Sequence, residues 1–239
     1  MEIIKGEKVC VNFGGLSALK DIDFYVKPKE IFGIVGPNGA GKTTLINTIT
    51  GLVEISSGRL FFKGKDITRM RPHEISRLGI ARTYQLVRPF LRLTTLQNVM
   101  VGALYGKSNI HNLDEAISVA EKYIEFVGLQ KKKNDLALNL NEVERKRLEL
   151  ARALATNPEV LLLDEVAAGS THAEMKEIME IVSELRESGL TICMVEHVMK
   201  MIMALADRIM VLHLGMKIAE GSPEKISNNK EVIKVYLGE

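Results

Sequence analysis

The stretch that decides the fold is GPNGAGKT, at residues 36–43. It follows the short apolar run IFGIV at 31–35, and the pattern predicts a helix over 44–50. Its glycines allow successive backbone N–H groups to curve around phosphate oxygens, and the helix N-terminus adds the positive end of its dipole. The pattern G-x-x-x-x-G-K-[ST] is that of a phosphate loop, in which Lys42 bridges the β- and γ-phosphates and Thr43 binds Mg²⁺. An accidental glycine-rich turn is the alternative, but the strand–loop–helix context favours a nucleotide, bound by Gly36, Pro37, Asn38, Gly39, Ala40, Gly41, Lys42, Thr43 and Thr44.

Two further apolar runs, LLL at 161–163 and TICMV at 191–195, also end in charged residues. Continuous apolar runs are typical of strands covered on both faces of a parallel sheet, where working residues lie just beyond the carboxyl ends. A buried Asp164 is costly unless something pairs with it, so we interpret it as a Mg²⁺ ligand shared with Thr43. Glu165 is then placed to take a proton from an attacking water. The alternative for Asp164 is a cap of the following helix.

The remaining patterns predict how the chain is organised. Residues 1–30 alternate apolar and polar side chains, as an antiparallel edge layer does, and 58–67 fit a hairpin. The strand signal is absent from about 88 to 149, where 114–128 has the apolar spacing of one helix face, beginning at an N-cap Asp114. We therefore predict an α/β core with a helical insertion.

Composition excludes several classes of protein. The 239 residues include 32 basic and 30 acidic side chains, so the near-neutral charge gives no reason to expect nucleic acid as a partner. No apolar run reaches the roughly 18 residues of a membrane-spanning helix. Two cysteines cannot form a disulfide framework, which indicates a reducing compartment. A soluble, cytosolic chain is the expectation.

Together, the phosphate loop, the acidic strand end and the helical insertion resemble the nucleotide-binding subunits of ABC transporters, over essentially the whole chain. The resemblance implies a P-loop NTPase fold with a RecA-like α/β core, an antiparallel β layer and an inserted α-helical subdomain. It places the core at 1–87 and 156–239 and the helical subdomain at 88–155. ATP and Mg²⁺ are the implied cofactors, and ATP hydrolysis is the implied activity.

Three side chains take their expected roles from this resemblance. Gln85 matches the family's Q-loop glutamine, which would contact Mg²⁺ and the attacking water and sense the membrane subunits; a surface glutamine at a strand end is the alternative. His197 matches the switch histidine that contacts the γ-phosphate, although a lone histidine is more often structural. Phe13 lies where the family places an aromatic ring that stacks on adenine, and packing in the core is its alternative.

The sequence departs from the family at the signature, where LNEVE at 140–144 replaces LSGGQ. In the family this segment reaches across a dimer to the partner's γ-phosphate. Asn141 can still cap the helix that follows. Glu142, however, brings a negative charge towards a phosphate, and Val143 limits close backbone approach. The segment expected to act in trans is Asn141, Glu142, Val143 and Glu144.

Longer stretches narrow the subfamily. The segments at 148–169 and 195–212 and the terminal VIKVYLGE resemble ATPases of branched-chain amino acid importers of the LivG/LivF kind. The implied function is import of branched-chain or other hydrophobic amino acids, driven by nucleotide-dependent dimerisation. Two alternatives stay open: the ATPase of a lipopolysaccharide or lipid exporter, and a weakened nucleotide-binding partner in a heterodimer.

The implied partners follow from the same resemblance. They are integral-membrane permease subunits, a second ATP-binding subunit in a homo- or heterodimer and, through the complex, a solute-binding protein. The expected location is cytoplasmic, peripheral on the inner face of the cell membrane. Soluble ABC ATPases of DNA repair or translation need a long coiled-coil insertion or two cassettes, and 239 residues hold neither.

Overall fold

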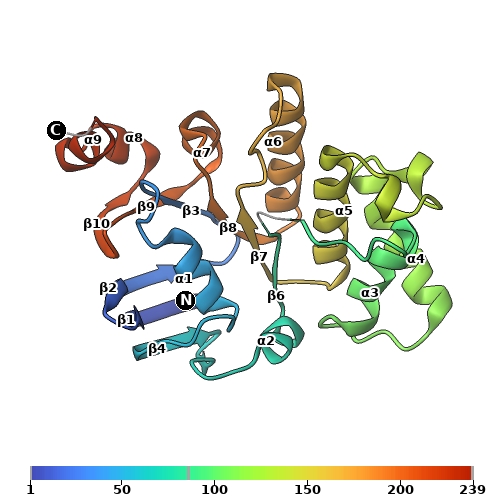
Figure 1. Cartoon of the computed structure of the whole chain (residues 1–239), viewed down its shortest axis with the longest axis horizontal. Coiled ribbons are helices and arrows are strands. Elements are labelled where there is room, and N and C mark those ends of the chain that lie inside the picture. The colour runs from blue at the N-terminus through green and yellow to red at the C-terminus, as the bar shows by residue number, and fades with distance from the viewer. Residues whose placement is uncertain (1, 85–86, 238–239) are drawn as a thin grey trace. The chain divides into compact units, whose positions relative to one another are not determined.

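A computed structural model describes residues 2–84 and 87–237 of the chain (Figure 1). The chain divides into two compact units. The core unit comprises Met1–Pro72 and Ala167–Glu239, and the helical unit comprises His73–Val166. We describe each unit by itself.

One sheet of the core unit is antiparallel, as the alternating pattern of residues 1–30 predicts. Its strand order is β2-β1-β4-β5, and the predicted hairpin at 58–67 corresponds to the pair β4–β5. Side chains of β1 and β2 alternate between buried and exposed along much of each strand, because one face of the sheet packs on the core. The strands are β1 (Ile4–Phe13), β2 (Leu16–Val26), β4 (Ser57–Phe62) and β5 (Lys65–Asp66).

The other strands of the core unit build the sheet that carries the phosphate loop. Strand β3 pairs in parallel with β8 on one side and with β9 on the other, and β10 runs antiparallel to β9. Every residue of β3 and β8 is buried, which is why their sequences are continuous apolar runs. The strands are β3 (Ile31–Val35), β8 (Thr191–Val195), β9 (Arg208–His213) and β10 (Met216–Gly221). The helices are α1 (Lys42–Ile49), α6 (His172–Glu187), α7 (Met199–Leu205), α8 (Pro223–Ser227) and α9 (Lys230–Leu237).

The helical unit combines a parallel strand pair with a helix cluster. Strands β6 and β7 pair in parallel, and helices α3, α4 and α5 share one apolar core that includes Val99, Ile124 and Leu148. Figure 1 shows these three helices side by side. The elements are α2 (Pro72–Leu78), β6 (Ile80–Arg82), α3 (Thr95–Tyr105), α4 (Leu113–Phe126), α5 (Glu142–Ala155) and β7 (Val160–Asp164), with 3-10 turns at Gln130–Lys132 and Ala137–Asn139.

The start of α4 corrects one expectation. The N-cap is Asn112 rather than Asp114, because the Asn112 side-chain oxygen accepts hydrogen bonds from the N–H groups of Asp114 and Glu115. Gly128 follows the helix with a left-handed φ of 74°, as the predicted stop requires. The helices α3–α5 lie within the predicted subdomain 88–155, whereas the compact helical unit also takes in α2 and the strands β6 and β7. The predicted boundaries stay a prediction.

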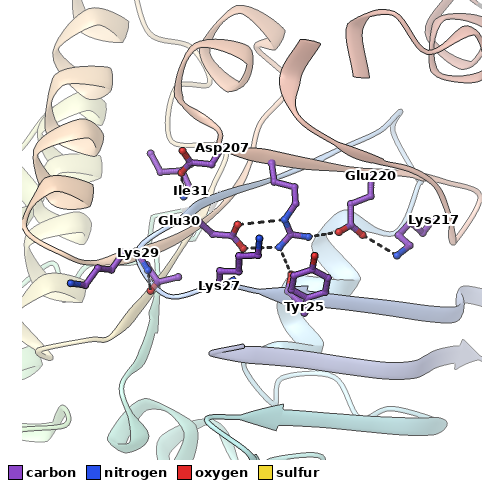
Figure 2. A network of polar contacts seen from close by, with 10 residues as sticks. Tyr25, Lys27, Lys29, Glu30, Ile31, Asp207, Lys217 and Glu220 are labelled. Atoms are coloured by element: carbon purple, nitrogen blue, oxygen red, sulfur yellow. Dashed lines mark hydrogen bonds and ion pairs between the residues drawn. The ribbon is translucent and has the colours of Figure 1, made fainter. Parts of the chain in front are cut away.

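A buried arginine joins the two sheets of the core unit. Arg208 on β9 donates to Glu30 Oε1 at 2.6 Å and to the Tyr25 carbonyl at 2.6 Å, and it pairs with Glu220 on β10. Its guanidinium also lies over the rings of Tyr25 and Phe32. Figure 2 shows the carboxylates of Glu30 and Glu220 approaching from opposite sides, above Tyr25. The side chains of Arg208 and Glu30 are 12% and 9% exposed, so solvent screens this pair only weakly.

We expect Arg208→Met to lower the free energy of unfolding by about 3–5 kcal/mol, because it leaves the buried carboxylate of Glu30 without its cation. Lys176→Met is the matched control, since Lys176 pairs with Glu180 at 3.8 Å on an exposed helix face. Its loss should stay within about 0–1 kcal/mol. Urea unfolding of both variants measures the difference, and equal losses would contradict the role given to Arg208.

Candidate functional site

The phosphate loop joins β3 to α1 through glycines in unusual conformations. Gly36, Gly39 and Gly41 have φ values of 153°, 76° and 103°, a region that side-chain-bearing residues rarely adopt. Gly41 is the N-cap of α1, and no described side chain caps this helix. The N–H groups of its first turn therefore face the loop without a side-chain acceptor, as an anion site requires.

The loop backbone is pressed against two neighbouring strands. A Cβ on Gly36 would lie 2.1 Å from the carbonyl oxygen of Leu212 on β9, and one on Gly41 would lie 2.7 Å from that of Ala18 on β2. A Cβ on Gly39 would meet nothing within 4 Å. Gly36 and Gly41 thus fix where the loop lies, whereas Gly39 is open to solvent.

The turn between β9 and β10 is hydrogen-bonded to the loop, and the sequence analysis gave it no role. Gly215, between β9 and β10, donates its N–H to the Ala40 carbonyl at 3.1 Å and accepts from the Lys20 N–H at 2.8 Å. It has a φ of 79°, and Leu214 before it has a φ of 48°. The Leu-Gly pair between two apolar runs could have indicated a tight turn, but its contact with residue 40 joins distant parts of the sequence.

The Lys42 ammonium lies over the centre of the loop. Nζ donates to the carbonyls of Gly36 at 2.7 Å and Pro37 at 2.9 Å, and the residue is buried. The side chains of Asn38 and Thr43 are exposed. A buried cation and an exposed hydroxyl at one loop match the two roles predicted for phosphate and Mg²⁺.

The strand register places the 196–197 pair at the same sheet edge as the loop. Ile34 of β3 lies opposite Val195 of β8 in parallel pairing, so His197 follows β8 at the level where Gly36 follows β3. Glu196 is buried and accepts the N–H of Ala167 at 3.0 Å, while His197 is exposed. The histidine predicted to contact phosphate is therefore accessible and follows a strand that neighbours β3.

Phe13 ends β1 and pairs with Leu16 across the hairpin. Its side chain is 50% exposed, so the alternative of core packing is wrong. The exposed ring can serve as a stacking platform, and its role with adenine stays a prediction.

The acidic strand end belongs to the helical unit. Asp164 ends β7 with its side chain 1% exposed, and its Oδ2 lies 3.0 Å from Nη2 of Arg82 on β6. Its N–H donates to Thr83 Oγ1 at 3.3 Å. Glu165 has a left-handed φ of 53° and is 9% exposed, and such backbone strain gathers at functional sites. The alternative for Asp164 is wrong, because the next helix, α6, is capped by Thr171.

The segment at 141–144 forms a capping box at the start of α5. Asn141 Oδ1 accepts the Glu144 N–H at 2.8 Å, and Glu144 Oε2 accepts the Asn141 N–H at 2.9 Å. Glu142 is exposed and Val143 is half-buried. The expected cap at Asn141 is confirmed, and the signature role of the segment stays a prediction.

Gln85 lies outside the described residues, but its neighbour Tyr84 is held by a buried acid that the sequence analysis missed. The Tyr84 N–H donates to Glu149 Oε2 on α5 at 3.1 Å. Burial raises the pKa of Glu149 to about 7, although the Tyr84 N–H, Arg152 and Arg82 act in the opposite direction. No signal in the stretch LELARAL marks it, because in sequence Glu149 looks like an ordinary exposed helix residue.

Burial raises the pKa of the Tyr236 phenol on α9, and the backbone of Gly36 acts in the opposite direction. The last helix of the core unit therefore lies near the phosphate loop.

Two features are absent from the described part of the chain. No group of three or more His, Cys, Asp or Glu side chains in it is arranged to hold a metal ion. None of the helices in residues 2–84 and 87–237 is long and apolar enough to cross a membrane.

Comparison with known proteins gives matches over the whole chain. The model of the family "ABC transporter" matches residues 19–168, and that of "Branched-chain amino acid ATP-binding cassette transporter" matches 216–239. The LivG high-affinity branched-chain amino acid transport ATP-binding protein of Escherichia coli K12 is 38% identical, with 97% of this chain and 96% of LivG aligned. BraF of Pseudomonas aeruginosa, also a high-affinity branched-chain amino acid transport ATP-binding protein, is 36% identical, with 99% of this chain and 98% of BraF aligned.

Comparison with solved structures gives matches to cassettes of ABC transporters. Crystal structures of one ATP-binding cassette of an ABC transporter, nucleotide-free and in the ADP conformation, each superpose with a TM-score of 0.89 at 33% identity and cover 100% of both chains. A Clostridium perfringens cassette that is part of an ABC transporter complex gives 0.85 at 30% identity, covering 99% of this chain and 95% of that one. The predicted fold class is confirmed.

The contrast between two loop glycines can be tested by substitution. We expect Gly36→Ala to abolish nucleotide binding and to lower the free energy of unfolding by about 3 kcal/mol or more, because the new Cβ meets a backbone oxygen in a strained conformation. Gly39→Ala is the control, with left-handed strain of about 1–2 kcal/mol and open space around it. Binding of a fluorescent ATP analogue and urea unfolding measure both effects; equal behaviour of the two variants would contradict the packing argument.

The raised pKa of Glu149 has a consequence for stability. Below about pH 4.5 the carboxyl is protonated in both the folded and the unfolded chain, and between pH 4.5 and 7 only the unfolded chain ionises it, so stability falls as the pH rises. The full loss above pH 7 is about 3 kcal/mol. Glu149→Gln should therefore stabilise the protein at pH 8 but not at pH 5.

Urea unfolding of Glu149→Gln and of the parent chain at the two pH values measures this difference. Exposed Glu125→Gln is the control and should shift stability equally at both. A stability gain in Glu149→Gln that does not depend on pH would show that ionisation of this carboxyl does not weaken the fold.

Proposed function

The chain belongs to the ABC transporter family of ATP-binding cassettes and is an ATPase, and from this premise we propose that it powers the import of branched-chain or other hydrophobic amino acids. The phosphate loop, pressed between β2 and β9 with Lys42 at its centre, is the observation that carries the ATPase mechanism. The matches to LivG and BraF, and the family match at 216–239, support the amino acid class. These comparisons do not favour the alternatives, a lipid exporter or a weakened heterodimer partner.

In this proposal the chain holds ATP with groups that have distinct tasks. The N–H groups of the loop and of the first turn of α1 bind the phosphate oxygens of the nucleotide, and Lys42 turns from the Gly36 and Pro37 carbonyls towards the β- and γ-phosphates. The remaining loop residues, Asn38 to Thr44, follow the phosphate chain. The exposed ring of Phe13 stacks on adenine.

The oxygen donors fit Mg²⁺. The Thr43 hydroxyl and the Asp164 carboxylate are hard ligands of the kind that this ion prefers, and the amide oxygen of Gln85 is a third. When bound, Mg²⁺ neutralises charge on the β- and γ-phosphates. Arg82, which pairs with Asp164 at 3.0 Å, orients that carboxylate.

The chemical step assigns work to three side chains. Glu165 accepts a proton from the attacking water. His197 donates a hydrogen bond to the γ-phosphate as it is transferred, and Gln85 orients the water.

The proposed unit of action is a dimer. The segment Asn141–Glu144 of one chain would meet the γ-phosphate bound by its partner, so that two chains enclose ATP and their closure moves permease subunits between inward- and outward-facing states. The permeases, with a solute-binding protein through the complex, place the chain peripherally on the cytoplasmic face of the membrane.

Glu165→Gln tests this mechanism. Without the acceptor for the proton of water, hydrolysis should fall by about 10²-fold or more while ATP binding persists, so that ATP-bound dimers accumulate. ATPase assays and light scattering with MgATP measure the two effects. Glu187→Gln, an exposed glutamate at the end of α6, is the control and should leave both unchanged. A Glu165→Gln variant that stays monomeric with ATP would count against the enclosed dimer.

A further inference from the structure

Helix α5 carries a buried acid that lies outside the family motifs. Glu149 is 3% exposed, with Oε2 accepting the Tyr84 N–H at 3.1 Å and Oε1 lying 3.5 Å from Nη2 of Arg152. Oε1 has no hydrogen bond to any residue in the described ranges 2–84 and 87–237. The principal contact of this carboxylate is therefore with the backbone of residue 84.

Tyr84 is also held from its other side. The guanidinium of Arg82 lies over the Tyr84 ring at 4.3 Å, and Arg82 Nη2 contacts Asp164 Oδ2 at 3.0 Å. Tyr84 thus connects the strand end that carries Asp164 to helix α5, through its ring on one side and its N–H on the other.

The chain beyond residues 85–86 returns to the same helix. Arg152, one turn after Glu149, donates to the Arg88 carbonyl at 3.3 Å and lies over the Phe90 ring at 5.6 Å. Asn98, fully buried on α3, accepts the Phe90 N–H at 2.8 Å and donates to the Phe90 carbonyl at 3.1 Å. The ion-paired Glu149 and Arg152 therefore hold residues on both sides of Gln85.

Stability does not account for a glutamate at this position. Desolvation is the largest influence on its pKa, and it opposes the ionised form that best accepts the Tyr84 N–H. An apolar side chain of similar volume would pack at lower cost in the same place. Glu149 weakens the fold and makes one strong contact, the hydrogen bond from the Tyr84 N–H. That hydrogen bond best explains why a glutamate occupies this position.

We propose that Glu149 is a positioning residue for ATP hydrolysis, which ties the backbone just before Gln85 to the helix that begins at Asn141. Together with Arg152, which donates to the Arg88 carbonyl, it ties residues 84 and 88 to α5. The inference rests on the proposed function and adds to it a residue that contacts neither nucleotide nor metal. Its acceptor oxygen, rather than its charge, is the essential part.

Two substitutions separate the acceptor from the charge. Glu149→Gln keeps an oxygen for the Tyr84 N–H and removes the charge, and Glu149→Met removes both at similar volume. Glu125→Met, at an exposed position on α4, is the matched control. Hydrogen exchange of the full chain without nucleotide reports the tether directly, independently of activity.

We expect the Tyr84 amide to exchange about tenfold faster or more in Glu149→Met than in the parent chain, and within about threefold of the parent in Glu149→Gln and Glu125→Met. Unchanged exchange in Glu149→Met would overturn the proposed tether. Faster exchange spread over the whole helical unit would overturn it as well, since that result indicates general loosening.

Steady-state hydrolysis of MgATP by the same full-length variants tests the positioning role. We expect kcat to fall about tenfold in Glu149→Met with KM within about twofold, and to stay within about threefold of the parent in Glu149→Gln. Parent-like kcat in Glu149→Met, or a rise in KM that accounts for the loss, would overturn the proposal. Absence of hydrolysis by the parent chain would instead contradict the proposed function.

Discussion

The close approach of the phosphate loop to two strands is the constraint on which the rest of the core unit depends. To bend around an anion, the backbone of the loop passes close to the carbonyl oxygens of Leu212 and Ala18. A Cβ on Gly36 or Gly41 would collide with these oxygens. Strand β9 must therefore lie beside β3, and β2 of the antiparallel layer must reach the loop. The Gly215 turn and the buried Arg208 hold β9, β10 and β2 in these places. Stability and nucleotide binding thus depend on the same contacts.

In the helical unit, buried charged side chains hold the backbone segments that carry predicted site residues. Asp164 and Arg82 are both buried and ion-paired, and Glu149 is buried with a raised pKa. Apolar residues would give a more stable core at all three positions. The charges instead connect the end of β7, the residue before Gln85 and the helix that begins at Asn141. Because these contacts are directional, they fix the geometry of the groups that they join.

Much of this could be predicted from sequence because the decisive signals are local. The phosphate loop is eight consecutive residues, and Asp164 and His197 each follow an apolar run whose burial on both faces marks a strand. What escaped prediction joins distant positions: Gly215 contacts residue 40, and Glu149 contacts residue 84. In sequence, Glu149 and Arg152 look like an ordinary exposed pair one helical turn apart. Only the packing of α5 shows that the acid is buried, so its role could not be read from spacing.

The replacement of LSGGQ by LNEVE at 140–144 has a physical consequence. The side chains of Asn141 and Glu144 each accept the other residue's backbone N–H. These two N–H groups at the start of α5 therefore have acceptors without any ligand. A phosphate presented by a partner chain must therefore compete with the Glu144 carboxylate for the Asn141 N–H and must approach the exposed negative charge of Glu142. Both carboxylates weaken this half of a shared site relative to LSGGQ, whose glutamine can form the same capping box but carries no negative charge. The same two hydrogen bonds of the capping box stabilise the helix and lower its affinity for phosphate. Tight closure of the proposed dimer then depends more heavily on the intact phosphate loop than on the segment that faces it.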